Sequence, residues 1–277
     1  MTSFPSASHQ SPTKDAAEAE RFDRLLPEAI RKLAPEIRYR AENALDGFIR
    51  AKALLPIDRE IASFRAITAA EEAASALIRS LQLREYPGAH LVDLRKHPHK
   101  AAVPLFLNAV RHEIAGDKEI DLTVTLSADP PKLTVALPVR QFVGLPDDLA
   151  NVHIQLVDPL GMVSSKPGVR ESDYFDDAVQ RVAGSRKVDK LIASEANARN
   201  RILYAHDGGL PRSQATLQSI EQRERNAKLC LFLAIAVMQV DHHQGMALQC
   251  LAGFLKVIGR SDASQMEFDS SPVHAPD

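Results

Sequence analysis

Apolar residues recur at helical spacing along most of the chain. Phe22, Leu25, Leu26, Ile30 and Leu33 form one such stripe, and steps of three and four positions are typical of the buried face of an α-helix. Comparable stripes predict helices over 15–33, 37–55, 68–82, 104–114, 174–183, 185–207, 211–240 and 246–258. The chain is therefore predicted to be mainly helical.

In one region the period changes to two. Apolar and polar residues alternate over 120–126, 133–137 and 152–156, which is typical of half-buried strands. The turn at 129–131 contains two prolines, so the first two strands should form a hairpin. We therefore predict a mainly α fold, a multi-helix bundle with a small inserted antiparallel β-sheet of about three strands.

The ends of the chain differ in composition from its middle. Residues 1–14 are rich in Ser, Pro and Thr, and 260–277 are polar, so both are expected to be tails, the first of them disordered. Residues 15–259 are predicted to form a single domain, with the β insertion at about 119–158.

Local signals divide the segment before residue 83 into two helices. Asp58 is a suitable N-cap for a short helix. Thr68 and Glu71 have the spacing of a capping box, which predicts a second helix that begins at Thr68 and gives Glu71 a structural role. Glu72 is expected to face solvent, with a buried polar pairing as the alternative.

Composition sets limits on function. The net charge of the 277 residues is −2, so the chain has no overall attraction to nucleic acid, and any basic patch is local. Cys230 and Cys250 lie within apolar helical patterns, which favours buried thiols in a reducing compartment. The first residues lack the apolar core of a signal peptide. We expect a cytoplasmic protein.

The most apolar segments, 229–240 and 246–258, are shorter than the ~20 residues that span a bilayer. No transmembrane segment is therefore predicted. The first of these segments is apolar on nearly all sides, which indicates a helix surrounded by protein. A hairpin of the two that inserts into a membrane remains a weaker alternative.

Histidines cluster in the segment 90–100, where His90, His97 and His99 accompany several basic residues. A metal site, a loop that contacts phosphate and a solvated turn all fit this composition, and the turn is favoured because no further ligand has a diagnostic spacing. The pair at 242–243 is interpreted as a polar corner between helices. We expect no metal and no cofactor.

The stretch 185–211 carries the main candidate site. Arg199 and His206 are seven residues apart, so in a continuous helix they share one face, two turns apart. Glu195 lies one turn before Arg199 on that face. Basic residues outnumber acidic ones between 181 and 201, and such a patch can hold a polyphosphate backbone.

Two segments together resemble the HEPN superfamily. One is the acidic pair on the alanine-rich segment 68–74 (TAAEEAA), and the other is 199–206 (RNRILYAH), followed by a glycine turn and an apolar last helix. In that superfamily an Arg, often followed by a residue such as Asn, precedes a His with four to six residues between them. Arg199 and Arg201 both match with His206, and helical geometry favours Arg199. The resemblance covers about half of the chain and leaves the sheet unexplained.

The resemblance implies a metal-independent endoribonuclease, often of a bacterial defence or toxin system and usually a homodimer. His206 would then be the general acid–base, Arg199 would hold the phosphate, and Asn200 would orient the pair. The surrounding charges imply substrate-binding roles for further residues. These are Glu195, Arg201, Lys187 and Lys190.

A second functional class stays open beside the enzyme. The chain could be a non-catalytic helical interaction or regulatory protein that uses the sheet as its contact surface. In that case Glu195 and Arg199 would form only an exposed ion pair, which stabilises a helix by about 0.3–0.5 kcal/mol.

Overall fold

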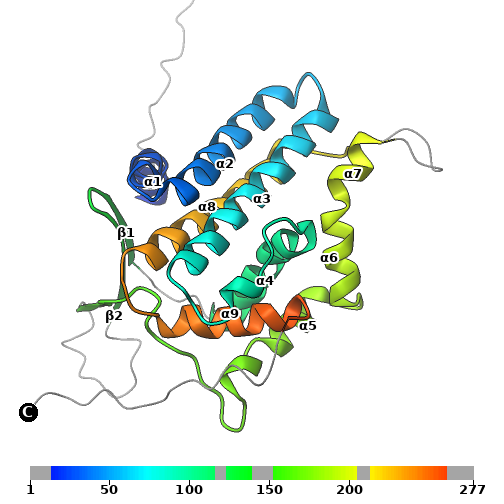
Figure 1. Cartoon of the computed structure of the whole chain (residues 1–277). Coiled ribbons are helices and arrows are strands. Elements are labelled where there is room, and N and C mark those ends of the chain that lie inside the picture. Colours follow the sequence, from blue (N-terminus) through cyan, green and yellow to red (C-terminus); the bar gives the residue numbers. More distant parts are fainter. Residues whose placement is uncertain (1–13, 116–122, 139–151, 205–212, 261–277) are drawn as a thin grey trace, which may run out of the picture.

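The computed structural model describes residues 14–115, 123–138, 152–204 and 213–260, and it is a helical bundle with a small three-stranded sheet, as the sequence predicts (Figure 1). The helices are α1 (Lys14–Arg31), α2 (Pro35–Leu54), α3 (Arg59–Leu83), α4 (His97–Ala115), α5 (Asp176–Ala183), α6 (Val188–Ala196), α7 (Ala198–Leu203), α8 (Leu217–Met238) and α9 (Gly245–Val257). The strands are β1 (Thr123–Ala128), β2 (Pro131–Pro138) and β3 (His153–Gln155), and short 3-10 helices cover Ala89–Leu91 and Glu171–Asp173. Apart from Lys14 and Arg260, both predicted tails lie outside the described residues.

Small residues let the helices α2 and α3 pack closely. Both helices bury many alanines, and Gly47 of α2 lies against Ala69 of α3. A Cβ atom at Gly47 would come within 2.8 Å of the Ala69 Cβ atom, which is closer than packed carbon atoms approach. Helices α8 and α4 pack against α3 on its other sides (Figure 1). Helix α3 is therefore at the centre of the bundle.

The predicted break at Thr68 is wrong, because α3 is one helix. It begins after Asp58, whose side chain accepts a hydrogen bond from the Ile61 backbone N–H at 2.9 Å. The Thr68 hydroxyl donates to the Arg65 carbonyl at 3.0 Å, as a threonine inside a helix can do, and forms no capping box. Glu71 therefore lies mid-helix and has no capping role.

Two other helix starts also differ from prediction. Helix α4 begins at His97 and includes Pro104 in its interior, whereas the sequence predicted a start at Pro104. Helix α8 begins at Leu217 rather than near residue 211, because Thr216 and Ser219 form a capping box, with the Ser219 N–H donating to the Thr216 hydroxyl at 3.2 Å. At α8 the local cap therefore outweighed the proline used as a start signal.

The sheet has the strand order β1-β2-β3, and both strand pairs are antiparallel. Val124 pairs with Val135 across the hairpin, and Leu137 pairs with Ile154. Leu126 and Leu133 are buried, and α1 packs against β1. Strand β3 is shorter than predicted, and its side chains are exposed on both faces.

Three glutamines attach the sheet and the following segment to the bundle. The Gln239 side chain accepts from the Leu133 N–H at 2.7 Å and donates to the carbonyl of the same residue at 3.0 Å. The buried Gln249 does the same with Ser164, at 3.1 and 2.7 Å. The buried Gln244 accepts from the Leu160 N–H at 2.8 Å. We call these contacts the glutamine clamps.

Within the described parts of the chain, no helix combines the length and the apolar character needed to cross a lipid bilayer. The apolar half of α8 is mostly buried, as predicted, although Leu229 is 38% exposed.

Candidate functional site

The stretch around Arg199 forms two helices rather than one. Helix α6 ends at Ala196, and α7 begins at Ala198 and ends at Leu203, followed by Tyr204 in an extended conformation (φ −120°, ψ 137°). Arg199 and His206 would share one helical face only in a continuous helix, and the helix does not continue past Leu203 to Tyr204. His206 itself lies outside the described residues.

Arg199 instead contacts residues that are far away in sequence. One guanidinium nitrogen lies 2.5 Å from the Nε2 atom of His97, at the start of α4. Another lies 3.9 Å from the Oε2 atom of Glu71, in the middle of α3. Helix α7 packs against α3, and α6 packs against α4 (Figure 1). The fold therefore brings three helices together at Arg199.

Glu71 is the centre of this group. Its Oε2 atom lies 2.8 Å from the Nδ1 atom of His97 and 3.3 Å from the ammonium nitrogen of Lys100. Its Oε1 atom is buried and has no hydrogen-bond partner among the described residues. We call Glu71, His97, Lys100 and Arg199 the Glu71 cluster.

The partners of His97 determine where its ring proton lies. A guanidinium group can only donate hydrogen bonds, so the Nε2 atom facing Arg199 must be the acceptor. The proton then lies on Nδ1 and is donated to the Glu71 carboxylate. The imidazole is therefore neutral and oriented from both sides.

Exposure increases from the bottom of the cluster towards solvent. The side chains are 7% exposed for Glu71, 10% for Lys100, 25% for Arg199 and 34% for His97. The Glu71 carboxylate and the two cations, Lys100 and Arg199, give the cluster a net positive charge. Arg199 is the more exposed of the two cations. A buried carboxylate below an open Arg and His gives a site suited to an oxyanion such as phosphate.

The other predicted site residues are not part of the cluster. Asn200 and Arg201 are exposed on α7, and an Arg201 nitrogen lies 3.4 Å from the Ser194 hydroxyl. Lys187 and Lys190 are exposed at the start of α6, at the opposite end of that helix from α7 (Figure 1). The structure therefore separates these lysines from Arg199 along the length of α6.

The ion pair of Glu195 with Arg199, which the non-catalytic alternative implied, is wrong. The helix break between α6 and α7 separates them, and the carboxylate of Glu195 lies 3.5 Å from an Arg223 nitrogen on α8. Both groups of that pair are exposed, so water screens it.

The solvated turn favoured for the segment 90–100 is wrong for its last four residues, because they are the first turn of α4 and are half-buried. The Asp93 N–H donates to the Nδ1 atom of the buried His99 at 3.0 Å. Burial, followed by the charge of Lys96, lowers the pKa of His99. Among the described residues, no group of His, Cys, Asp and Glu has the arrangement of a metal site.

A second buried glutamate provides a contrast. Glu113, in the last turns of α4, pairs through one oxygen with Lys166 and through the other with Arg181. Burial alone would raise the pKa of Glu113, but the ion pairs with these two cations outweigh burial and lower it. Both carboxylate oxygens are engaged, so this group fastens α5 and the segment before it to α4.

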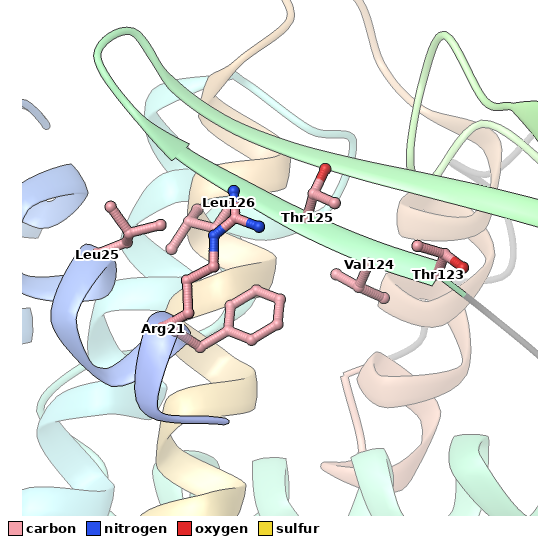
Figure 2. A pocket seen from close by; sticks show the side chains of 7 residues that line it. Arg21, Leu25, Thr123, Val124, Thr125 and Leu126 are labelled. Carbon is pink, nitrogen blue, oxygen red and sulfur yellow. The ribbon is translucent and has the colours of Figure 1, made fainter. Parts of the chain in front are cut away.

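A small hollow, partly open to solvent, lies between α1 and β1. Figure 2 shows Arg21, Leu25 and the side chains of 123–126 around it, and Phe22 also lines it. Its walls are mostly apolar, and it contains no member of the Glu71 cluster.

Sequence reasoning selected Arg199 but missed its partners Glu71 and Lys100. A signal for Glu71 exists: with Ile67, Ala74 and Ile78 it occupies one apolar stripe of a continuous α3. A carboxylate at a buried stripe position requires cationic or hydrogen-bonding partners. The capping-box interpretation hid this signal.

The comparisons with known proteins give no assignment. No protein-family model matches the chain, and neither the curated proteins nor the solved structures include a significant match.

Proposed function

We propose that this protein is a metal-independent endoribonuclease of the HEPN-like type and that the Glu71 cluster handles the phosphate. The single observation that carries the proposal is the Arg199 guanidinium in contact with an imidazole that a buried carboxylate orients. A cation for the phosphate and a group for proton transfer are the two components that RNA cleavage without metal requires.

The cluster is suited to this chemistry. The Arg199 guanidinium can bind two phosphate oxygens at once and stabilise the charge that develops on them. Lys100 adds a second positive charge nearby. In RNA the ribose 2′-oxygen can attack the adjacent phosphorus while the 5′-oxygen leaves, which yields a 2′,3′-cyclic phosphate. This reaction needs no external nucleophile and no oxidant.

The proposal includes the roles that the resemblance implies. His206 transfers protons, Asn200 orients the reacting groups, and Arg201, Lys187, Lys190 and Glu195 contact the substrate. It also includes a homodimer in the cytoplasm, with a role in defence or as a toxin. The exposed positions of Lys187, Lys190 and Arg201 support a contact with a polyanion.

The test is incubation of the purified protein with mixed RNA in EDTA. We expect cleavage by the wild type, and a loss of about 100-fold or more in Arg199→Ala, because the charge on the phosphate is no longer stabilised. Arg50→Ala is the matched control, since among the described residues Arg50 pairs with Asp46 of the same helix alone, and both groups are exposed. His206→Ala tests the sequence-derived role of that residue.

The substrate itself provides a further control. An oligonucleotide with a 2′-deoxyribose at the cleaved position should resist the enzyme. Absence of cleavage by a folded wild type under all conditions would overturn the proposal.

A non-catalytic interaction protein is the second candidate. Exposed apolar side chains in and after β3 support it, among them Val157 (87% exposed), Met162 (48%) and Val163 (49%). This candidate gains if the wild type is inactive on RNA while substitutions in that segment abolish binding to a partner.

A further inference from the structure

We infer that His97 is a catalytic residue of this site, the general base that takes the proton from the attacking ribose hydroxyl, and that Glu71 is its positioning residue. This inference rests on the proposed endoribonuclease function. It assigns proton transfer to a residue outside the segment 199–206, which contains the whole sequence motif.

The imidazole of His97 presents an unprotonated nitrogen to the phosphate site. Its Nδ1 proton is held by the Glu71 carboxylate at 2.8 Å, so Nε2 carries the free electron pair. Nε2 is also the nitrogen that faces Arg199, the residue proposed to bind the phosphate. A phosphate held by Arg199 would therefore lie beside the basic nitrogen, as a general base requires.

The basic nitrogen of His97 is masked until a phosphate binds. In the free protein, the Arg199 guanidinium donates to Nε2 and occupies its electron pair. A phosphate oxyanion is a stronger acceptor than a neutral imidazole, because it carries charge. Binding of the substrate should draw the guanidinium onto the phosphate and release Nε2. Arg199 lies on the short helix α7 and is partly exposed, so its side chain has room to turn.

In the cleavage step, Nε2 of His97 takes the proton of the 2′-hydroxyl, and the 2′-oxygen forms a bond to phosphorus. The bond from phosphorus to the 5′-oxygen breaks, and that oxygen takes a proton from water. The imidazolium then returns its proton to the hydroxide that remains. No metal or redox partner takes part.

Burial of Glu71 strengthens its hold on His97. Its carboxylate is almost completely inside the protein, where an opposite charge interacts more strongly than in water. It holds the ring in one tautomer and stabilises the imidazolium as it forms. The Oε1 atom has no hydrogen-bond partner among the described residues. An unpartnered buried oxygen costs stability, and such costs are typical of functional sites.

His97→Gln is the decisive variant, because the glutamine amide can still donate to Glu71 and accept from Arg199 but cannot take up a proton. A purely structural His97 predicts that this variant retains activity. A general base predicts a fall in kcat of about 100-fold or more. His112→Gln is the matched control, since His112 is exposed on the same helix.

Each outcome decides between the hypotheses. A folded His97→Gln with activity within about threefold of an active wild type overturns the inference and leaves the proposed function intact, with His206 as the remaining candidate base. An inactive wild type overturns both.

If His97→Gln does not fold, acylation of the wild type with diethyl pyrocarbonate replaces this variant. Inactivation should then follow the modification of His97, measured by mass spectrometry, and a 2′-O-methyl RNA should protect. Full activity after modification of His97 overturns the inference.

Glu71 requires a readout that a loss of stability does not change. In Glu71→Gln we expect kcat to fall at least tenfold while KM changes by less than about threefold, since the carboxylate acts through His97 and does not touch the RNA. If kcat and KM changed by the same factor, or if neither changed, Glu71 would not be the positioning residue of His97.

Discussion

Two glutamates are buried beside opposite ends of helix α4, and basic side chains surround both. Glu71 of α3 meets His97 and Lys100 in the first turn of α4, whereas Glu113 lies in the last turns of α4 itself. The side chains are similarly buried, at 7% and 8% exposed. Burial alone therefore does not distinguish a functional carboxylate from a structural one.

The distribution of partners distinguishes the two. Each oxygen of Glu113 has its own cation, Lys166 or Arg181, and nothing is left unpaired. In the Glu71 cluster all contacts converge on one oxygen, the other has no partner among the described residues, and one of the contacts is a neutral imidazole that can exchange a proton. A fully paired carboxylate joins segments, whereas an incompletely paired one with a histidine can serve chemistry.

The largest effect on stability is expected from Glu71→Ala. This substitution leaves the Lys100 ammonium, only 10% exposed, without its partner in the interior. Loss of one member of a buried pair typically costs 3–5 kcal/mol of unfolding free energy. Urea unfolding measures the change, and replacement of Lys100 by Met in the same chain should restore part of the loss. If Glu71→Ala lowered the free energy of unfolding by less than Glu113→Ala does, the contrast between the two glutamates would be contradicted.

Glu113→Gln should cost less, about 1–2 kcal/mol at neutral pH, because Lys166 and Arg181 can return to water. The pKa of Glu113 is lower in the folded protein than its ordinary value of 4.5. Its contribution to stability is therefore present above pH 4.5 and lost as the pH falls through the folded pKa. The difference between wild type and variant, measured by urea unfolding from pH 7 to pH 3, should close at the acid end.

A smaller effect is expected from His99, which lies in the first turn of α4 with His97 but is predicted to change the stability of the fold with pH. Burial, then Lys96 and Arg260, lower its pKa from the ordinary 6.5, against the opposite influence of Asp93. The neutral form thus stabilises the fold above pH 6.5, and this contribution is lost as the pH falls through the folded pKa. His99→Gln, which can still accept from the Asp93 N–H, should make the loss of stability from pH 7 to pH 5 less steep. An unchanged slope in thermal melts would contradict this.

The smallest effects are expected from charges that belong to neither glutamate. Lys187→Ala and Lys190→Ala should each weaken RNA binding only a few-fold and reduce the slope of log affinity against log salt by about 1. Fluorescence anisotropy over a salt series measures both quantities. The midpoint of thermal unfolding should not move, since both side chains are exposed.

Periodicity predicted most of the fold, because a buried helix face leaves a repeat in the sequence. Helices α2 and α9 and the β1–β2 hairpin lie close to their predicted positions. Helix starts were less predictable: the Thr68–Glu71 spacing fits a cap, but Ala62 and Ala66 before it are buried in the same core as the residues after it, so α3 continues through this segment. Capping signals are local, whereas the choice among them depends on tertiary packing.

The site was less predictable than the fold. Arg199 could be selected from its local composition, but its partners Glu71 and His97 are 128 and 102 positions away in the chain. Contacts across such separations leave no spacing pattern. The helical-face argument joined Arg199 to residues near in sequence, and the break at Asn197 removed the geometry on which that argument depended.

The glutamine clamps attach the sheet and the segment after it to the helices through backbone groups, so this attachment does not depend on most of the side chains in those segments. Gln239 and Gln249 bind the peptide groups of Leu133 and Ser164, and those groups are the same for every amino acid except proline. Evolution or an engineer could therefore rewrite much of that segment's surface, and with it whatever the surface recognises, while its anchorage to the helices stays in place.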